Sequence, residues 1–176
     1  MVYIESQRLR MSPIRMDHWS LFRRLHQDEA VIRYISDKRN LVEIRARFDE
    51  RLVEWHWGDG HWLCLVISHK LTGEWLGICG LQLNDDQTSV QIGYLLLEEF
   101  QNQGLGTEAL MALVSYIEHY LPVMEVRATV TDGNEASCAI LDKAQFDLED
   151  VEPLSLEIGG ELHDELIYVY RVRRRH

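Results

Sequence analysis

Long hydrophobic runs are missing from this chain of 176 residues. No apolar stretch reaches the roughly 18 to 20 residues that a membrane-spanning helix needs. The N-terminal residues carry acidic and basic side chains early and lack the apolar segment of a secretory signal. We therefore predict a protein that does not enter a membrane and is located in the cytoplasm.

Cysteines are few, and their spacing is not that of a metal site. The three cysteines, Cys64, Cys79 and Cys138, show none of the spacings typical of zinc ligands. Cys64 and Cys79 lie in apolar, strand-like runs, where a free cysteine behaves as a small core residue. The eight histidines form no HExxH motif. The sequence thus predicts neither a disulfide framework nor a structural metal.

Positive charge is also scarce, with 18 Lys and Arg against 29 Asp and Glu and a formal net charge of −11. Proteins that follow a nucleic-acid backbone need a basic face. The dense basic run here is confined to Arg171–Arg175, so we expect no nucleic-acid partner. An acidic surface favours a cationic partner, such as a free amine or a basic protein N-terminus.

What the chain does contain is typical of one globular domain spanning residues 1–176, with 46% apolar and 27% charged residues. Hydrophobic periodicity predicts a mixed α+β order of elements, with an antiparallel meander in the middle. The expected strands are Arg8–Ile14, Trp62–Ser68, Trp75–Leu83, Val90–Leu97, Val123–Val130 and Glu165–Arg173. The expected helices are Trp19–His26, Asp28–Ile35, Leu41–Trp57, one from Gly104 to Pro122, and one from Asn134 to Ala144.

A glycine-rich turn between the third meander strand and the following helix is the most informative segment. The strand sequence VQIGYLLLEEF leads into Gln101–Thr107, where the helix begins. The first turn of a helix has N–H groups without internal partners and a partial positive charge. Glycines let the backbone approach an anion closely, so the turn is suited to a diphosphate. From the glycines alone, an ordinary strand-to-helix turn is an equally good interpretation.

The same glycines also fit a dinucleotide fingerprint, Gly104-x-Gly106-x-x-Ala109, with Asp132 at the end of the next strand. Polar residues separate the strand from the first glycine, a meander precedes the motif, and too few residues follow Asp132 for further βαβ units. A nicotinamide-dependent oxidoreductase is therefore the weaker alternative. A P-loop is excluded because no Lys-Ser/Thr follows the glycines.

The turn Gln101-x-x-Gly104-x-Gly106 resembles the Q/R-x-x-G-x-G/A signature of the GNAT superfamily of N-acetyltransferases. Further segments occur in family order along nearly the whole chain: SQRLRM, LTGEWLGICGL, VQIGYLLLEEFQNQGLGTEAL, NEAS and GGELHDELIY. Together they are similar to the branch containing the ribosomal-protein N-terminal alanine/serine acetyltransferases. The resemblance implies a bent, mostly antiparallel sheet of about seven strands, with helices on both faces and a V-shaped opening between two central parallel strands. It also implies acetyl-CoA as cosubstrate, no metal, an amine acceptor, and a homodimer as one expected assembly.

The resemblance assigns roles to individual residues. The pantetheine arm would bind the backbone at Leu95, Leu96 and Leu97, with the Leu97 N–H as oxyanion donor. Asn134 would border the arm, although it also fits a plain helix N-cap. Ser137 would protonate the leaving sulfur, although it also fits a first-turn serine with a local backbone bond. The diphosphate would bind the N–H groups of Gln101, Asn102, Gln103, Gly104, Leu105, Gly106 and Thr107.

The chain departs from the family pattern at three positions. Gln91 stands where relatives often have glutamate, Leu141 where other branches have a tyrosine acid, and Gln145 where a glycine commonly ends the last helix. The general base is therefore open among water, Glu98, Asp85 and Asp164. A catalytically inactive acyl-CoA sensor or scaffold is a second hypothesis. The identity of the acceptor amine is not encoded in any motif.

Overall fold

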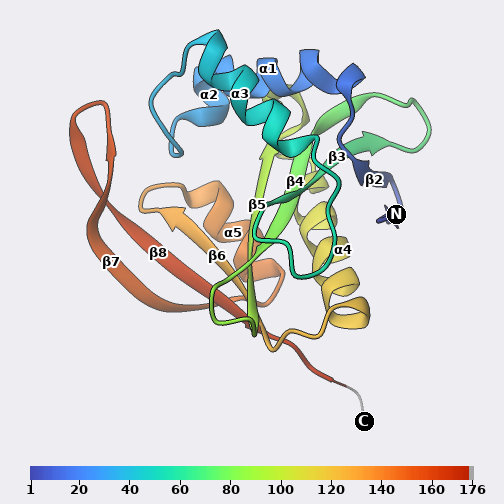
Figure 1. The fold of residues 1–176 in the computed structure, drawn as a ribbon. Coiled ribbons are helices and arrows are strands. Elements are labelled where there is room, and N and C mark those ends of the chain that lie inside the picture. The colour runs from blue at the N-terminus through green and yellow to red at the C-terminus, as the bar shows by residue number, and fades with distance from the viewer. Residues whose placement is uncertain (175–176) are drawn as a thin grey trace.

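Strands in the middle of the chain, of which Leu63–His69 and Trp75–Leu83 are largely buried on both faces, belong to one sheet that carries helices on either side (Figure 1). The structure is a computed structural model and describes residues 1–174. The strands are β1 (Ile4–Glu5), β2 (Leu9–Pro13), β3 (Leu63–His69), β4 (Trp75–Leu83), β5 (Ser89–Leu96), β6 (Glu125–Thr131), β7 (Asp147–Ile158) and β8 (Glu161–Arg171). The helices are α1 (Trp19–Gln27), α2 (Glu29–Ile32), α3 (Leu41–Arg51), α4 (Leu105–Tyr120) and α5 (Glu135–Lys143).

The sheet has the order β1-β2-β3-β4-β5-β6-β8-β7, and its strands are antiparallel except where β5 meets β6. These two parallel strands pair only over Ser89–Gln91 and Glu125–Arg127, and then separate (Figure 1). The remainder of β5 therefore has an edge that pairs with no strand on the β6 side. The V-shaped opening expected from the resemblance is confirmed.

Two clusters of apolar side chains hold the helices against opposite faces of the sheet. The first packs α4, through residues such as Leu110 and Leu113, against the face that includes Leu81. The second packs α1 and α3, through Phe22 and Phe48, against the opposite face. No helix in the described part of the chain is long and apolar enough to cross a bilayer.

Most predicted elements agree with the structure to within a few residues, but three details differ. Helix α3 ends at Arg51 and not at Trp57, because the chain turns there and Trp55 packs against the first cluster. Helix α2 ends at Ile32, short of the predicted Ile35. The sheet has eight strands, where about seven were expected, since it includes the two-residue β1 and the long β7.

Helix α5 ends in a left-handed residue that is not glycine. Gln145 has φ 66°. Its N–H donates to Asp142 O, and the Phe146 N–H donates to Leu141 O, a pattern that favours glycine at the Gln145 position. The cost anticipated for Gln145 from the sequence is therefore present in the fold.

We expect Gln145→Gly to raise the free energy of unfolding by about 1 kcal/mol, because glycine adopts this conformation without steric cost. Urea denaturation measures the change. Gln27→Gly, at the last residue of α1, is the control and should lower stability, since glycine there only adds freedom to the unfolded chain. Equal effects of the two changes would show that the conformation of Gln145 carries no strain.

Candidate active site

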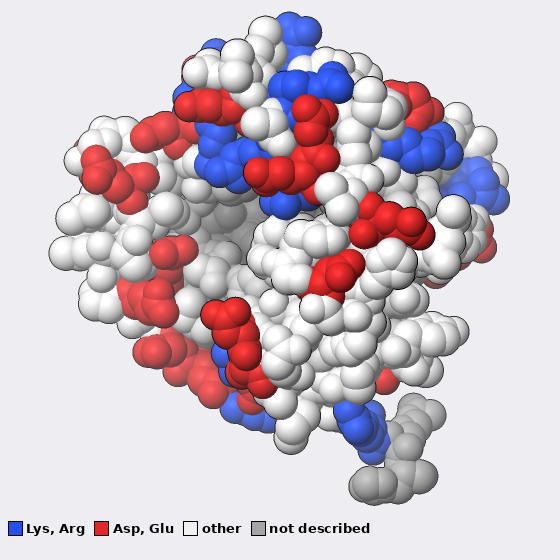
Figure 2. Space-filling view, viewed as in Figure 1, with Lys and Arg blue, Asp and Glu red and all other residues white. Residues whose placement is uncertain are grey.

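Two cavities meet beside the free edge of β5. The larger, about 640 Å³, is lined by the glycine-rich turn and is called the turn cavity here. The smaller, about 320 Å³, lies between the sheet and helices α1 and α3 and is called the inner cavity. Figure 2 shows the surface hollowed beneath these helices, between the β7–β8 hairpin and β5. Residues lining both cavities are Tyr34, Ile35, Tyr94, Leu95, Asn134 and Ser137.

The start of α4 offers a row of N–H groups to the turn cavity. Within residues 1–174, no protein acceptor pairs with the N–H groups of residues 102–107, and the N-cap Gly104 has no side-chain cap. Gly104 has φ 75°, a conformation that lets the chain enter the helix without a side chain in the way. Such an uncapped N-terminus favours an anion.

Gln101 differs from the rest of the turn because both its backbone and its side chain are already bonded. Its N–H donates to Glu98 O at 3.1 Å, and its side-chain amide donates to Leu96 O at 3.0 Å. Gln101 therefore fixes the turn against the end of β5 and does not offer its own N–H to a ligand.

Cationic side chains surround the same turn. Arg33 and Lys143 line the turn cavity. Arg8 donates from Nη1 to Gln103 O at 3.3 Å, and its Nε lies 2.6 Å from Glu108 Oε2. Because Glu108 belongs to the first turn of α4, this ion pair holds the N-terminal part of the chain next to the turn.

The end of β5 presents Leu96, and not Leu97, to the opening. The Leu97 N–H already donates to Leu76 O of β4 at 2.9 Å. Successive residues of an antiparallel strand direct their N–H groups to opposite sides, so that of Leu96 points away from β4. The bond from Gln101 to Leu96 O agrees with this direction. The Leu97 N–H, the oxyanion donor expected from the resemblance, is thus bonded within the sheet, and the Leu96 N–H is a second candidate for that role.

Ser137 and Tyr94 form a hydroxyl pair where the two cavities join. The Tyr94 hydroxyl lies 2.6 Å from Ser137 Oγ, and either can be the donor. Burial raises the pKa of Tyr94 to about 12, so the phenol keeps its proton at neutral pH. Asn134 caps α5 by accepting the Ser137 N–H at 3.2 Å, and it also lines both cavities. The N-cap interpretation of Asn134 is confirmed, and its place beside the pantetheine arm stays a prediction.

Comparison with known proteins places these features in a family. The model for the acetyltransferase (GNAT) domain matches residues 8–147. The chain belongs to the GNAT acetyltransferase family. It is 30% identical over 132 residues to the uncharacterized protein YkkB of Bacillus subtilis, covering 72% of this chain and 74% of that protein.

Solved structures share the GNAT fold with this chain. The ribosomal L7/L12 alpha-N-protein acetyltransferase RimL, in complex with coenzyme A, superposes with a TM-score of 0.83 at 21% identity, covering 97% of this chain and 98% of RimL. The spermidine N-acetyltransferase of Vibrio cholerae, in complex with CoA and spermine, gives 0.82 at 13% identity, covering 95% and 97%. The membership and the sheet topology rule out the dinucleotide-binding fold suggested by the glycine fingerprint.

The predicted site residues of this GNAT protein fall into two groups. Those that line one or both cavities are Leu95, Leu96, Gln101, Asn102, Gly104, Gly106, Thr107, Asn134 and Ser137. Gln103, Leu105 and Leu97 line neither cavity. Leu105 is buried in the core, and the Gln103 side chain donates to Glu99 O. Within the described residues, the backbone N–H groups of Gln103 and Leu105 have no protein acceptor.

None of the acidic candidates for the general base lines the inner cavity. Asp85 and Asp164 line neither cavity, and Glu98 lines only the turn cavity. Gln91 donates to Thr129 Oγ1 at 3.1 Å and lines neither cavity. Among residues 1–174, no group of three side chains that could hold a metal ion comes together.

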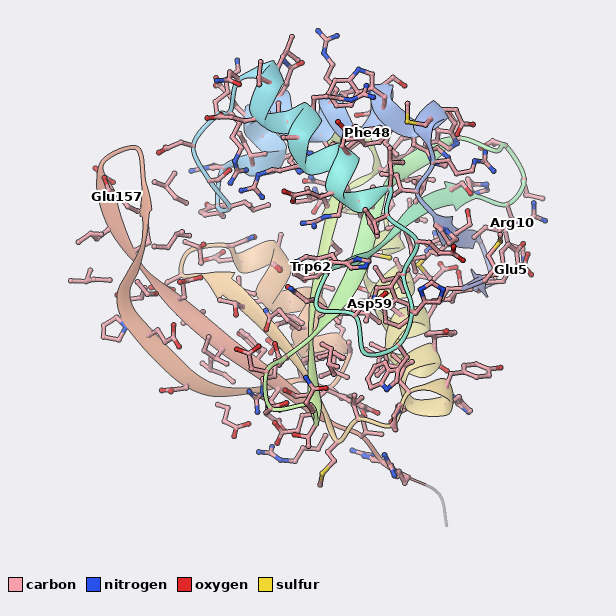
Figure 3. All side chains as sticks on the ribbon, in the orientation of Figure 1. Glu5, Arg10, Phe48, Asp59, Trp62 and Glu157 are labelled. Atoms are coloured by element: carbon pink, nitrogen blue, oxygen red, sulfur yellow. The ribbon has the colours of Figure 1, made fainter. Side chains whose placement is uncertain are left out.

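The inner cavity contains residues that the sequence analysis did not select. Arg47 and Arg51 reach it from α3, His26 from α1, and Trp62 from the loop before β3. Figure 3 shows Trp62 just beneath the C-terminal end of α3. The spacing of Arg47 and Arg51, four residues apart beside the apolar Phe48, is the one sequence signal that could have indicated them.

The His26 ring has a defined orientation. Its Nδ1 lies 2.8 Å from the Phe22 carbonyl oxygen, an acceptor, so Nδ1 carries the hydrogen and Nε2 keeps a lone pair. Burial lowers the pKa of His26, and the charges of nearby arginines lower it further. A neutral imidazole able to accept a proton therefore borders the inner cavity.

Proposed function

We propose that this protein transfers an acetyl group from acetyl-CoA directly to a primary amine. The observation that carries the proposal is the row of unpartnered N–H groups at the start of α4, which opens into a cavity continuous with the free edge of β5. A diphosphate satisfies these groups and the helix dipole together. Arg33, Lys143 and Arg8 add positive charge suited to the phosphates of coenzyme A.

The remaining site residues match the demands of the reaction. The Leu96 N–H at the free edge of β5 is suited to bind the pantetheine arm or the oxygen that becomes negative in the transition state. The Tyr94–Ser137 pair is suited to protonate the leaving thiolate. The amine has a solution pKa near roughly 10 and must lose a proton. We assign this step to His26, which lines the inner cavity, or to water, one of the candidates named from the sequence.

Free-thiol release tests the proposal. Purified protein is mixed with acetyl-CoA and a panel of primary amines that includes amino acids, polyamines, aminoglycosides and peptides with free N-termini. We expect thiol release that depends on one class of amine, with the acetylated amine identified by mass spectrometry. Tight acetyl-CoA binding without turnover for any amine would instead support the sensor hypothesis. The cytoplasmic location and the homodimer stay predictions.

We expect Ser137→Ala to lower kcat by about 100-fold, the range in which a positioned general acid acts. Tyr94→Phe should have a smaller effect, because the Ser137 hydroxyl remains and can regain its proton from water. Acetyl-CoA affinity, measured by calorimetry, should change by no more than about twofold, since neither change touches the turn. Ser115→Ala, on the exposed side of α4, is the control. An unchanged kcat in Ser137→Ala would remove the serine from the mechanism.

A further inference from the structure

The inner cavity has a charge opposite to that of the protein as a whole. Its charged lining residues are Arg47 and Arg51, and neither Asp nor Glu is among the residues that line it. The chain as a whole has a net charge of −11. The absence of acidic residues from this lining therefore indicates a local preference for an anion that the overall charge conceals.

These two arginines have no acidic partner in the described part of the chain. No ion pair of residues 1–174 includes Arg47 or Arg51, whereas Arg45 on the same helix pairs with Asp49 at 2.9 Å. Like charges four residues apart on a helix repel each other. Partial burial of a guanidinium without a carboxylate has a further cost, and burial lowers the pKa of Arg51. An anion bound by the two guanidinium groups would reduce the repulsion between them and the cost of burying Arg51.

Neighbouring groups restrict the position of the Arg51 guanidinium. It lies over the Trp62 ring, 5.6 Å from the ring centre. His26 lines the same cavity as Arg47 and Arg51, and the positive charges of these two arginines and of Arg39 lower its pKa. Figure 2 likewise shows blue side chains at the edge of the hollow beneath the helices. A guanidinium held in place loses less conformational freedom when it binds an anion.

We propose that the acceptor is a small amine that also carries an anionic group, a carboxylate or a phosphate, bound by Arg47 and Arg51. The amine would lie beside Tyr94 and Ser137, where the two cavities join, and the anion at the arginine end of the inner cavity. A volume of about 320 Å³ suits a small molecule. The role of this amine as acetyl acceptor rests on the proposed acetyltransferase function. The binding of its anionic group depends only on Arg47 and Arg51.

This inference changes the expectation drawn from net charge. A polyamine needs carboxylates around its remaining ammonium groups, and the lining of the inner cavity contains none. A planar guanidinium instead forms paired hydrogen bonds with a carboxylate or phosphate. The acidic outer surface and the basic cavity together favour an acceptor that is itself zwitterionic.

Matched pairs of amines that differ in one charge provide the test. The probes are glutamate against glutamine, glycine against glycinamide, and phosphoethanolamine against ethanolamine, with spermidine as the cationic case. We expect kcat/KM for at least one anionic member to exceed that of its neutral partner by about tenfold or more, as for loss of a charge-assisted hydrogen bond. A larger kcat/KM ratio for the glutamate or glycine pair would indicate a carboxylate, and a larger ratio for the phosphoethanolamine pair would indicate a phosphate.

The variants Arg47→Gln and Arg51→Gln should abolish this ratio, through a higher KM, and leave the affinity for acetyl-CoA unchanged. Arg45→Gln, which removes the same charge from the same helix outside the cavity, should keep the ratio. Circular dichroism confirms that each variant is folded. A ratio that persists in both variants, or a preference for glycinamide, ethanolamine or spermidine, would overturn the anion site.

A binding measurement separates this inference from the proposed function. Calorimetry follows glutamate and phosphoethanolamine binding to the protein saturated with coenzyme A, which does not require turnover. Binding that is lost in Arg51→Gln, without thiol release from any amine, would support the anion site and contradict the acetyltransferase proposal. Thiol release with neutral amines, without any binding that depends on the arginines, would do the reverse.

Discussion

Gly104→Glu is expected to reduce acetyl-CoA affinity by about 100-fold or more, corresponding to roughly 3 kcal/mol of binding free energy. The new carboxylate would lie at the uncapped start of α4, where it would accept the N–H groups itself and repel a diphosphate. A Cβ at this position would lie 3.6 Å from Arg8 Nη2, so the carboxylate would also draw that cation away from the ligand. The domain should stay folded, since the added strain is only about 1 kcal/mol.

Gly73→Glu is the matched control for this change. Gly73 has φ 74°, against 75° for Gly104, and a Cβ there meets nothing within 4 Å. It therefore reproduces the backbone strain and the added charge on a hairpin away from both cavities. Gly104→Ala isolates the strain at the site itself and should bind acetyl-CoA nearly as well as the original protein. If calorimetry finds equal affinity for Gly104→Glu and Gly73→Glu, the diphosphate does not bind at the turn.

The order of the elements was predictable because it depends on local periodicity. Apolar residues three or four apart along α4 follow the helical period, whereas β4 is a nearly continuous apolar run that is buried at every position from Leu76 to Leu81. The structure places both elements where these patterns predict them. The C-terminal end of α3 was not predictable in this way. Trp55 lies at a position that continues the helical period of α3. In the fold, however, it packs against the first cluster, whereas Ile44 and Phe48 of α3 belong to the second.

In the candidate site, too, residues in local motifs were predictable from the sequence, and those that depend on strand pairing were not. Gly104 and Ser137 could be selected from the sequence because each lies in a contiguous motif, and the structure places both beside the turn cavity. The choice between Leu96 and Leu97 needs the register of β5 against β4, which no local pattern supplies. A shift of one residue reverses the direction of every N–H group, so the resemblance alone could not show that the Leu97 N–H is bonded within the sheet.

The lining of the inner cavity was the least accessible to sequence reasoning. Arg47, His26 and Trp62 come from α3, α1 and a loop, and none is near another in the sequence. The acidic partner of Arg45 lies one helical turn away and is visible in the sequence. That Arg51 lies over Trp62 beside a cavity, by contrast, is visible only in the fold. Net charge averages over the whole surface and therefore gave no information about this cavity.

Phe48→Ala is expected to lower the free energy of unfolding by about 3 to 5 kcal/mol, the range for removing a buried aromatic side chain. Phe48 is fully buried, and its ring centre lies 5.2 Å from that of Trp19 and 5.3 Å from that of Phe22 (Figure 3). Urea denaturation measures the loss. Val42→Ala, on the same helix with 79% of its residue surface exposed, should change stability by less than about 0.5 kcal/mol.

The same variant tests how the two halves of the site are supported. Phe48 lies between Arg47 and Arg51 in the sequence, and it packs α3 onto α1 in the second cluster, whereas α4 and the turn belong to the first. At a temperature where Phe48→Ala remains folded, we therefore expect KM for the acceptor to rise while the acetyl-CoA affinity stays unchanged. If α3 moves independently, it displaces only the arginines that it carries, and acetyl-CoA binding is unaffected. A weaker affinity for both the acceptor and acetyl-CoA would show instead that the two clusters act as one unit.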